Sequence, residues 1–118
     1  MMNLTENALI RYCHSLPGAE EDVKWGNDLV FSVFDKMFCV FILPECADLT
    51  VKVPKEQFLA LTEQPDMTPA PYLARHGWVT IANLGNFKEQ TLHNYILTSY
   101  ELVVAKLPKS KQKQLSVG

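Results

Sequence analysis

The densest group of chemically capable side chains lies between residues 70 and 81. Four of its members carry functional groups: Tyr72, Arg75, His76 and Trp78. An arginine binds phosphates and carboxylates, and a histidine changes charge near neutral pH. The flanking prolines stiffen the approach, and Gly77 allows a positive φ before the Trp78 strand. The stretch predicts either a binding site or a closely packed turn.

No catalytic motif accompanies these residues. The sequence lacks the GxSxG pattern of hydrolases and both the GxGxxG and GxxxxGK[ST] phosphate loops. Cys13 directly precedes His14, but consecutive residues of a helix do not face each other, so this pair does not form a dyad. We therefore expect a protein that is not an enzyme.

Metal ligands are equally sparse. The sequence has no dense pattern of metal ligands and no CxxC pair. Its histidines and cysteines are His14, His76, His93, Cys13, Cys39 and Cys46. The run Glu20-Glu21-Asp22 is typical of a solvated acidic loop rather than a cation site. We expect no metal, no cofactor and reduced thiols, with Cys13 and Cys39 in the core.

Length and composition indicate one ordinary globular domain over residues 1–118. Of the 118 residues, 47% are hydrophobic and 20% charged, and the formal net charge is −2. The acids concentrate in the first 50 residues, whereas the last 17 carry four lysines and no acid. The N-terminus lacks the features of a signal peptide, and the apolar run Met37–Leu43 is too short to span a bilayer. We expect a cytoplasmic monomer that does not enter membranes.

Helical spacing of apolar residues marks both ends of the chain. Leu4 to Leu16 predicts a helix capped by Asn3 and Glu6, and residues 92–107 predict a longer helix capped by Asn86 that runs to about Lys106. A shorter helix follows Pro54. We expect residues 109–118 to form a basic, flexible tail.

Strand patterns fill the middle. They cover residues 29–34, 37–43, 49–53 and 78–82, with Asp35-Lys36 as a hairpin turn and Glu20–Asp28 as a loop. Strict alternation would place Phe38, Val40 and Ile42 on one face of the second strand. Residues 66–71 are too rich in proline for regular structure. The pattern predicts an α+β fold with both long terminal helices on one face of an antiparallel sheet of four or more strands.

Cations near aromatic side chains raise the possibility of nucleic-acid binding. The candidates are Lys24, Lys36, Lys52, Arg75, His76, Lys106, Lys109, Lys111 and Lys113. On the residues alone, a solvated lysine-rich surface is the more common meaning in a chain with a pI of about 5.9. An alternative is a small-ligand or protein-interaction pocket of Trp25, Tyr72, Arg75, His76 and Trp78. The same aromatic residues could also be core, with Tyr72-Leu73-Ala74 packed on the sheet.

Three separated motifs carry a family resemblance. Residues 22–26 (DVKWG), 70–78 (APYLARHGW) and 99–109 (SYELVVAKLPK) resemble the MmcQ/YjbR family of small bacterial proteins, in order and over nearly the whole chain. The turn at residues 34–36 departs from it, because family members often carry glycine there. The resemblance implies a fold similar to that of bacterial frataxin, CyaY. It also implies DNA binding through a double-wing motif. We therefore expect weak, non-enzymatic DNA binding, with the ligand or protein-interaction module as the alternative.

Overall fold

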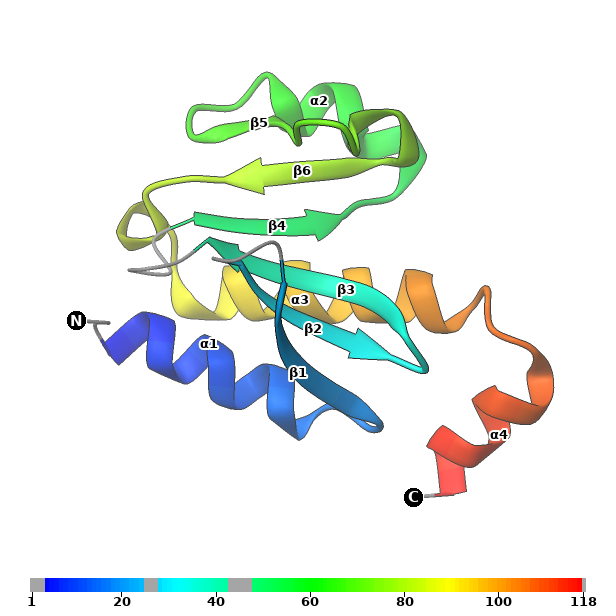
Figure 1. The fold of residues 1–118 in the computed structure, drawn as a ribbon. Coiled ribbons are helices and arrows are strands. Elements are labelled where there is room, and N and C mark those ends of the chain that lie inside the picture. The colour runs from blue at the N-terminus through cyan, green and yellow to red at the C-terminus, as the bar shows by residue number, and fades with distance from the viewer. Residues whose placement is uncertain (1–3, 25–27, 43–47, 118) are drawn as a thin grey trace.

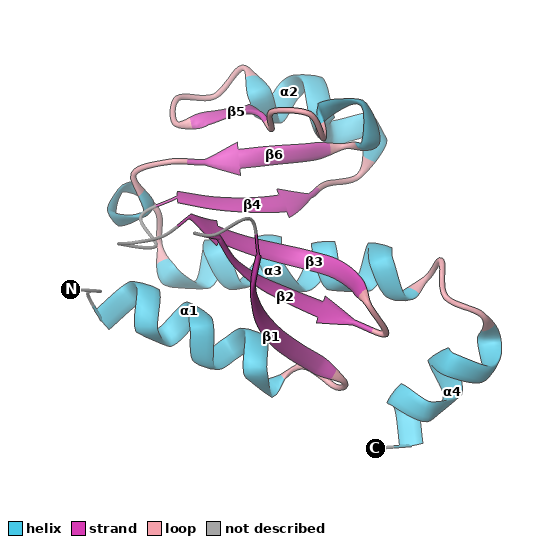
Figure 2. Cartoon of the chain, viewed as in Figure 1, coloured by secondary structure: helices cyan, strands magenta, loops and turns pink. Residues whose placement is uncertain are grey.

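A six-stranded antiparallel sheet, in the order β1-β2-β3-β4-β6-β5, forms the centre of the molecule (Figures 1 and 2). The structure is a computed structural model that describes residues 4–24, 28–42 and 48–117. The strands are β1 (Ala19–Lys24), β2 (Asp28–Val33), β3 (Lys36–Ile42), β4 (Asp48–Lys52), β5 (Met67–Pro69) and β6 (Trp78–Ile81). The helices are α1 (Leu4–Ser15), α2 (Phe58–Thr62), α3 (Glu89–Val104) and α4 (Lys109–Val117).

The main core lies between the sheet and the pair α1 and α3, which run side by side across one face (Figure 1). Tyr100 of α3 packs the edge of its ring against Phe38, with ring centroids 5.3 Å apart. Its hydroxyl donates a hydrogen bond of 2.6 Å to the carbonyl of Pro17, just beyond α1. Cys13 and Cys39 are buried, as predicted, with their sulfurs 3.8 Å apart. The predicted α+β fold, with both long helices on one face, is confirmed. No helix within the described ranges is both long and apolar enough to cross a membrane.

A β-bulge in β3 overturns the predicted alternation. Phe31 pairs with Cys39 and Ser32 pairs with Met37, so Phe38 is an extra residue without a partner in β2. Phe38 therefore joins Cys39 on the helix-covered face, where its ring contacts Tyr100. Val40 and Ile42 point to the opposite face. The prediction that Phe38 shares a face with these two residues was wrong, because alternation fails across a bulge.

The hydroxyl of Ser99 bridges β3 and β4 where their regular pairing ends at Cys39 and Val51. Ser99 is fully buried on α3. Its Oγ donates a 2.6 Å hydrogen bond to the carbonyl of Phe38 and accepts one of 2.9 Å from the amide of Lys52. A single side chain thus satisfies two backbone groups next to the bulge, which would otherwise lack partners in the protein interior.

Two predictions about the β1–β2–β3 region need correction. The acidic segment expected as a loop forms β1, since an edge strand needs only backbone pairing and tolerates charge on its exposed residues. The hairpin turn lies at Phe34 and Asp35 rather than at Asp35 and Lys36, because Val33 pairs with Lys36. Both turn residues have positive φ, at 46° and 64°, as a primed two-residue turn requires.

Three further elements differ from the sequence-based expectation. The proline-rich segment contributes the short edge strand β5. Asn86 does not cap α3, which begins after Lys88; its side-chain amide instead donates a 3.0 Å hydrogen bond to Asp66. The expected flexible tail forms α4, because the carbonyl of Pro108 accepts the first helical hydrogen bonds and Leu115 packs against the core. The predicted cap at Asn3 and the positions Trp25 and Cys46 lie outside the described residues, as does the side chain of Glu6.

We predict that Ser99→Ala lowers the free energy of unfolding by about 2–4 kcal/mol, because it leaves two buried backbone groups without a partner. Urea titration followed by circular dichroism measures the change. Ser110→Ala is the control, since Ser110 is exposed on α4, and it should change stability by less than about 0.5 kcal/mol. Equal stability of the two variants would show that the Ser99 bridge is dispensable.

Candidate functional site

A basic hollow of about 690 Å³ opens at the end of the sheet where β3 begins and β4 ends. The basic side chains that line it are Lys36, Lys52, His76 and Lys106. Among the described residues, Asp35 is the single acid in its lining. Trp78, which is only 6% exposed, forms part of its floor. The fold thus gathers four of the predicted nucleic-acid-binding residues around one concavity.

Each of these four side chains reaches the basic hollow from a different element. Lys36 is the first residue of β3, directly after the hairpin turn, and Lys52 is the last residue of β4, held through its amide by Ser99. His76 ends the 3-10 turn Ala74–His76, which Gly77 closes at a φ of 85°. Lys106 follows α3, with its amide bonded to the carbonyl of Val103. Four separate backbone segments therefore set the spacing of these side chains.

The ammonium groups of Lys52 and Lys106 lie close together. Burial lowers the pKa of Lys52 below its ordinary value, and the neighbouring charge of Lys106 and a side-chain contact with it lower this pKa further. Within the described part of the chain, neither lysine forms an ion pair with an acid. Since like charges held together repel, an anion placed between them would relieve this repulsion. The pair is therefore suited to bind an anion.

The C-terminal helix extends the positive charge along the same side. The Lys111 Nζ lies 5.3 Å from the centre of the Phe34 ring, in the hairpin turn that precedes Lys36. This cation–π contact holds α4 next to the turn. The same helix carries Lys109 and Lys113. The lysines of the predicted tail thus belong to an ordered helix beside the basic hollow.

Two predicted cations are not part of this cluster. Lys24 pairs with Asp28, which pairs with Ile42, so Lys24 lies at the opposite end of the sheet from Lys36. Arg75 is exposed, does not line the basic hollow, and its Nε donates a 3.3 Å hydrogen bond to the ring Nε2 of His76.

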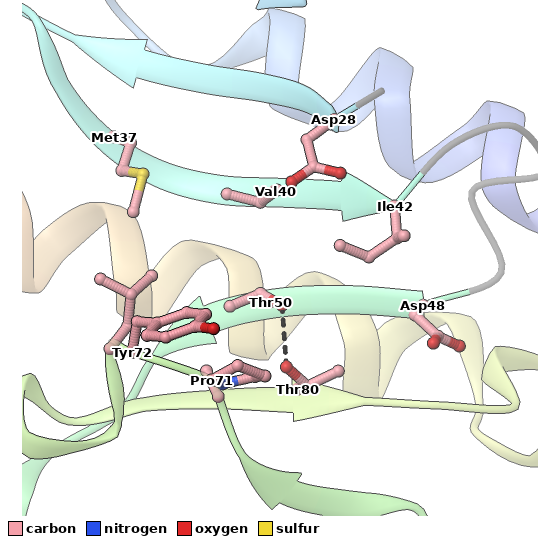
Figure 3. Close-up of a pocket in the computed structure, with 11 residues that line it drawn as sticks. Asp28, Met37, Val40, Ile42, Asp48, Thr50, Pro71, Tyr72 and Thr80 are labelled. Atoms are coloured by element: carbon pink, nitrogen blue, oxygen red, sulfur yellow. Dashed lines mark hydrogen bonds between the residues drawn. The ribbon is translucent and has the colours of Figure 1, made fainter. Parts of the chain in front are cut away.

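An apolar hollow of about 660 Å³ lies on the sheet face opposite α1 and α3 (Figure 3). Its apolar lining comes mainly from β3 and from the segment before the 3-10 turn: Met37, Val40, Ile42, Pro71, Tyr72 and Leu73. The hydroxyls of Thr50 and Thr80 bond to each other at 3.0 Å on its floor. Asp28 and Asp48 lie at one end, on the two strands that flank Ile42. The hollow has the size and polarity typical of a ligand site.

Tyr72 stands at the edge of the apolar hollow (Figure 3) and is 97% exposed, contrary to the prediction that it packs on the sheet. Its φ is 65°, in the left-handed region that a bulky residue rarely occupies. No burial of the ring compensates for this conformation. Strained backbone of this kind is concentrated at functional sites. The feature makes Tyr72 a candidate contact residue.

The residues of the alternative ligand pocket do not form one cluster. Tyr72 lines the apolar hollow, His76 and Trp78 line the basic hollow, and Arg75 lines neither. Trp25 lies outside the described residues. The sequence-based prediction missed the strand residues of the apolar hollow, such as Val40 and Ile42. A signal that could have found them is the apolar character of both faces of residues 37–43.

Comparisons with known proteins agree with this architecture. Residues 14–102 match the model of the family described as YjbR. The chain is 28% identical over 116 residues to the uncharacterized protein YjbR of Escherichia coli K12, covering 95% of this chain and 98% of that one. The crystal structure of Deinococcus radiodurans DR2400, with domain DUF419, superimposes with a TM-score of 0.82 at 27% identity, covering 93% of this chain and 86% of the other.

A more distant crystal structure, of a protein from Pseudomonas syringae, is similar in fold. It superimposes with a TM-score of 0.68 at 19% identity, covering 82% of this chain and 97% of that one. The resemblance that the three sequence motifs predicted is confirmed by the family and relative matches.

We predict that Tyr72→Gly raises the free energy of unfolding by about 0.5–1 kcal/mol, because glycine adopts positive φ without steric cost and the exposed ring loses little packing. Leu59→Gly is the matched control. Leu59 is 76% exposed in α2, where ordinary helical φ makes glycine unfavourable, so this variant should lose about 1 kcal/mol. Thermal unfolding of both variants measures the changes, and a clear loss of stability in Tyr72→Gly would contradict the assignment of strain.

Proposed function

We propose that this chain, which belongs to the YjbR family, binds DNA weakly. The contacts in this proposal join the basic hollow to the phosphate backbone. The observation that supports the proposal is the convergence of Lys36, Lys52 and Lys106 on one concavity. In this proposal the protein acts in the cytoplasm as a monomer, by binding alone rather than by catalysis.

Phosphates are the anions that this arrangement fits. Lysine ammonium groups provide strong, mobile donors, and the close approach of Lys52 and Lys106 favours an anion between them. Lys111 lies beside the hairpin turn, so a second phosphate of the same strand has a partner outside the basic hollow. Several phosphates of one backbone can thus be neutralised at once.

The uneven charge of the sheet supports binding on this side. The acids Glu20, Glu21 and Asp22 lie on β1, and two strands separate β1 from β4. The net charge of −2 therefore conceals a local excess of positive charge at the basic hollow. Local charge rather than net charge determines how a polyanion is oriented on a surface.

The double-wing designation associated with the family implies DNA binding, but the proposal rests on the lysines of the basic hollow rather than on the designation. The alternative expected from the sequence, a small-ligand or protein-interaction module, is supported by the apolar hollow and the exposed Tyr72. A small ligand or a protein partner would contact Tyr72 without needing the lysines. The two proposals therefore differ in which variants abolish binding.

We predict that the double variant Lys52→Gln/Lys106→Gln weakens DNA binding and makes the slope of log K against log salt less negative by about 1.8, since each lost phosphate contact contributes about 0.9. Fluorescence anisotropy of a labelled duplex in 50–300 mM KCl measures the slope. Lys55→Gln/Lys88→Gln is the matched control, because both lysines are exposed, neither lines the basic hollow, and the double variant removes the same total charge. It should leave the slope nearly unchanged.

Two outcomes would contradict the proposal. One is an equal loss of affinity in both double variants, which would indicate attraction by net charge alone. The other is the absence of wild-type binding at about 50 mM salt, where phosphate contacts are strongest.

A further inference from the structure

We infer that the basic hollow and the apolar hollow form one site for single-stranded nucleic acid, with phosphates in the basic hollow and an unstacked base on the ring of Tyr72. This inference rests on the proposed function and specifies which form of nucleic acid the site accepts.

The two hollows are contiguous. Met37 and Leu73 line both of them. Met37 follows Lys36 on β3, and Leu73 lies between Tyr72 and the 3-10 turn that ends with His76. Lys36 pairs with Val33 and Val40 pairs with Val30, which are three residues apart on β2, or about 10 Å at the usual rise of a strand. This separation is comparable with the reach of one nucleotide from its phosphate to the far edge of its base.

Backbone hydrogen bonds fix the segment that carries Tyr72. The amide of Leu73 donates to the carbonyl of Ala70 at 3.2 Å, and the amide of Trp78 donates to the carbonyl of Leu73 at 3.4 Å. Pro71 restricts the chain directly before the tyrosine. An exposed aromatic ring on a fixed backbone, beside a positively charged groove, is the combination that proteins use to stack the bases of single strands.

The lining of the apolar hollow favours a base over a phosphate. Its floor is apolar except for Thr50 and Thr80, whose hydroxyls bond to each other. The carboxylates of Asp28 and Asp48 at its far end repel phosphates but can accept hydrogen bonds from the amino groups of bases (Figure 3). The charges therefore assign the backbone to the basic end and the base to the apolar end.

A duplex cannot use the apolar half of this site, because its bases are stacked and paired inside the helix. A duplex retains only the phosphate contacts at the basic hollow. The arrangement thus predicts a preference for single strands that depends on Tyr72, whereas the dependence on Lys52 and Lys106 is common to both forms.

The test compares a labelled 12-nucleotide single strand of mixed sequence with the same sequence as a duplex, at 50 mM salt, on the full chain. We expect the wild type to bind the single strand about 10-fold more tightly. Tyr72→Ala should lower single-strand affinity about 10-fold and leave duplex affinity unchanged, as expected for the loss of one stacking contact. Tyr72→Phe, which keeps the ring, should bind as the wild type does.

Leu59→Ala serves as the control for loss of an exposed apolar side chain. If Tyr72→Ala leaves single-strand affinity unchanged while Lys52→Gln/Lys106→Gln lowers it, the inference is overturned and the proposed function stands. If neither oligonucleotide binds, both are overturned. If dodecanoate binds in a Tyr72-dependent manner and the single strand does not, the contiguous site belongs to a small amphiphilic anion, and the inference is wrong.

Discussion

The hydroxyl of Ser99 is the contact on which both the core and the basic hollow depend. It joins the carbonyl of Phe38 to the amide of Lys52, where the bulge in β3 ends the regular pairing with β4. Three residues near this bridge line the basic hollow: Lys36 and Met37 precede the bulge, and Lys52 follows the last residue of β4 that pairs with β3. Because Ser99 belongs to α3, the packing of that helix also sets the spacing of the lysines. Stability and charge geometry are therefore coupled through one buried side chain.

The fold could be predicted from the sequence where patterns are regular. The apolar stripe of α3 and the hairpin of β2 and β3 were both recognisable. The bulge was not, because Phe38 and Cys39 are both apolar and an extra apolar residue leaves no trace in the polarity pattern. The strand β1 was hidden by its acids, and α4 by its polar composition. In both elements, pairing or docking onto a neighbouring element outweighs the weak local signal.

The candidate site was predictable only in part. Basic residues were identified individually by type, but the sequence does not show that Lys36, Lys52 and Lys106 meet while Lys24 lies at the other end of the sheet. That distinction depends on strand register. The apolar hollow was missed because Val40 and its neighbours look like core residues. The exposure of Tyr72 was also unexpected, since prolines and aromatic residues together usually indicate a packed turn.

In the inferred site, the basic hollow and the apolar hollow act as one surface for a single strand. The most direct measurement is the mapping of amide chemical shifts in ¹⁵N-labelled protein during titration with an unlabelled single-stranded oligonucleotide. We expect the largest shifts at residues that line one or both hollows: Lys36, Met37, Leu73 and Lys106. Shifts concentrated on α1 and β1, or shifts scattered evenly over the molecule, would contradict the inferred site.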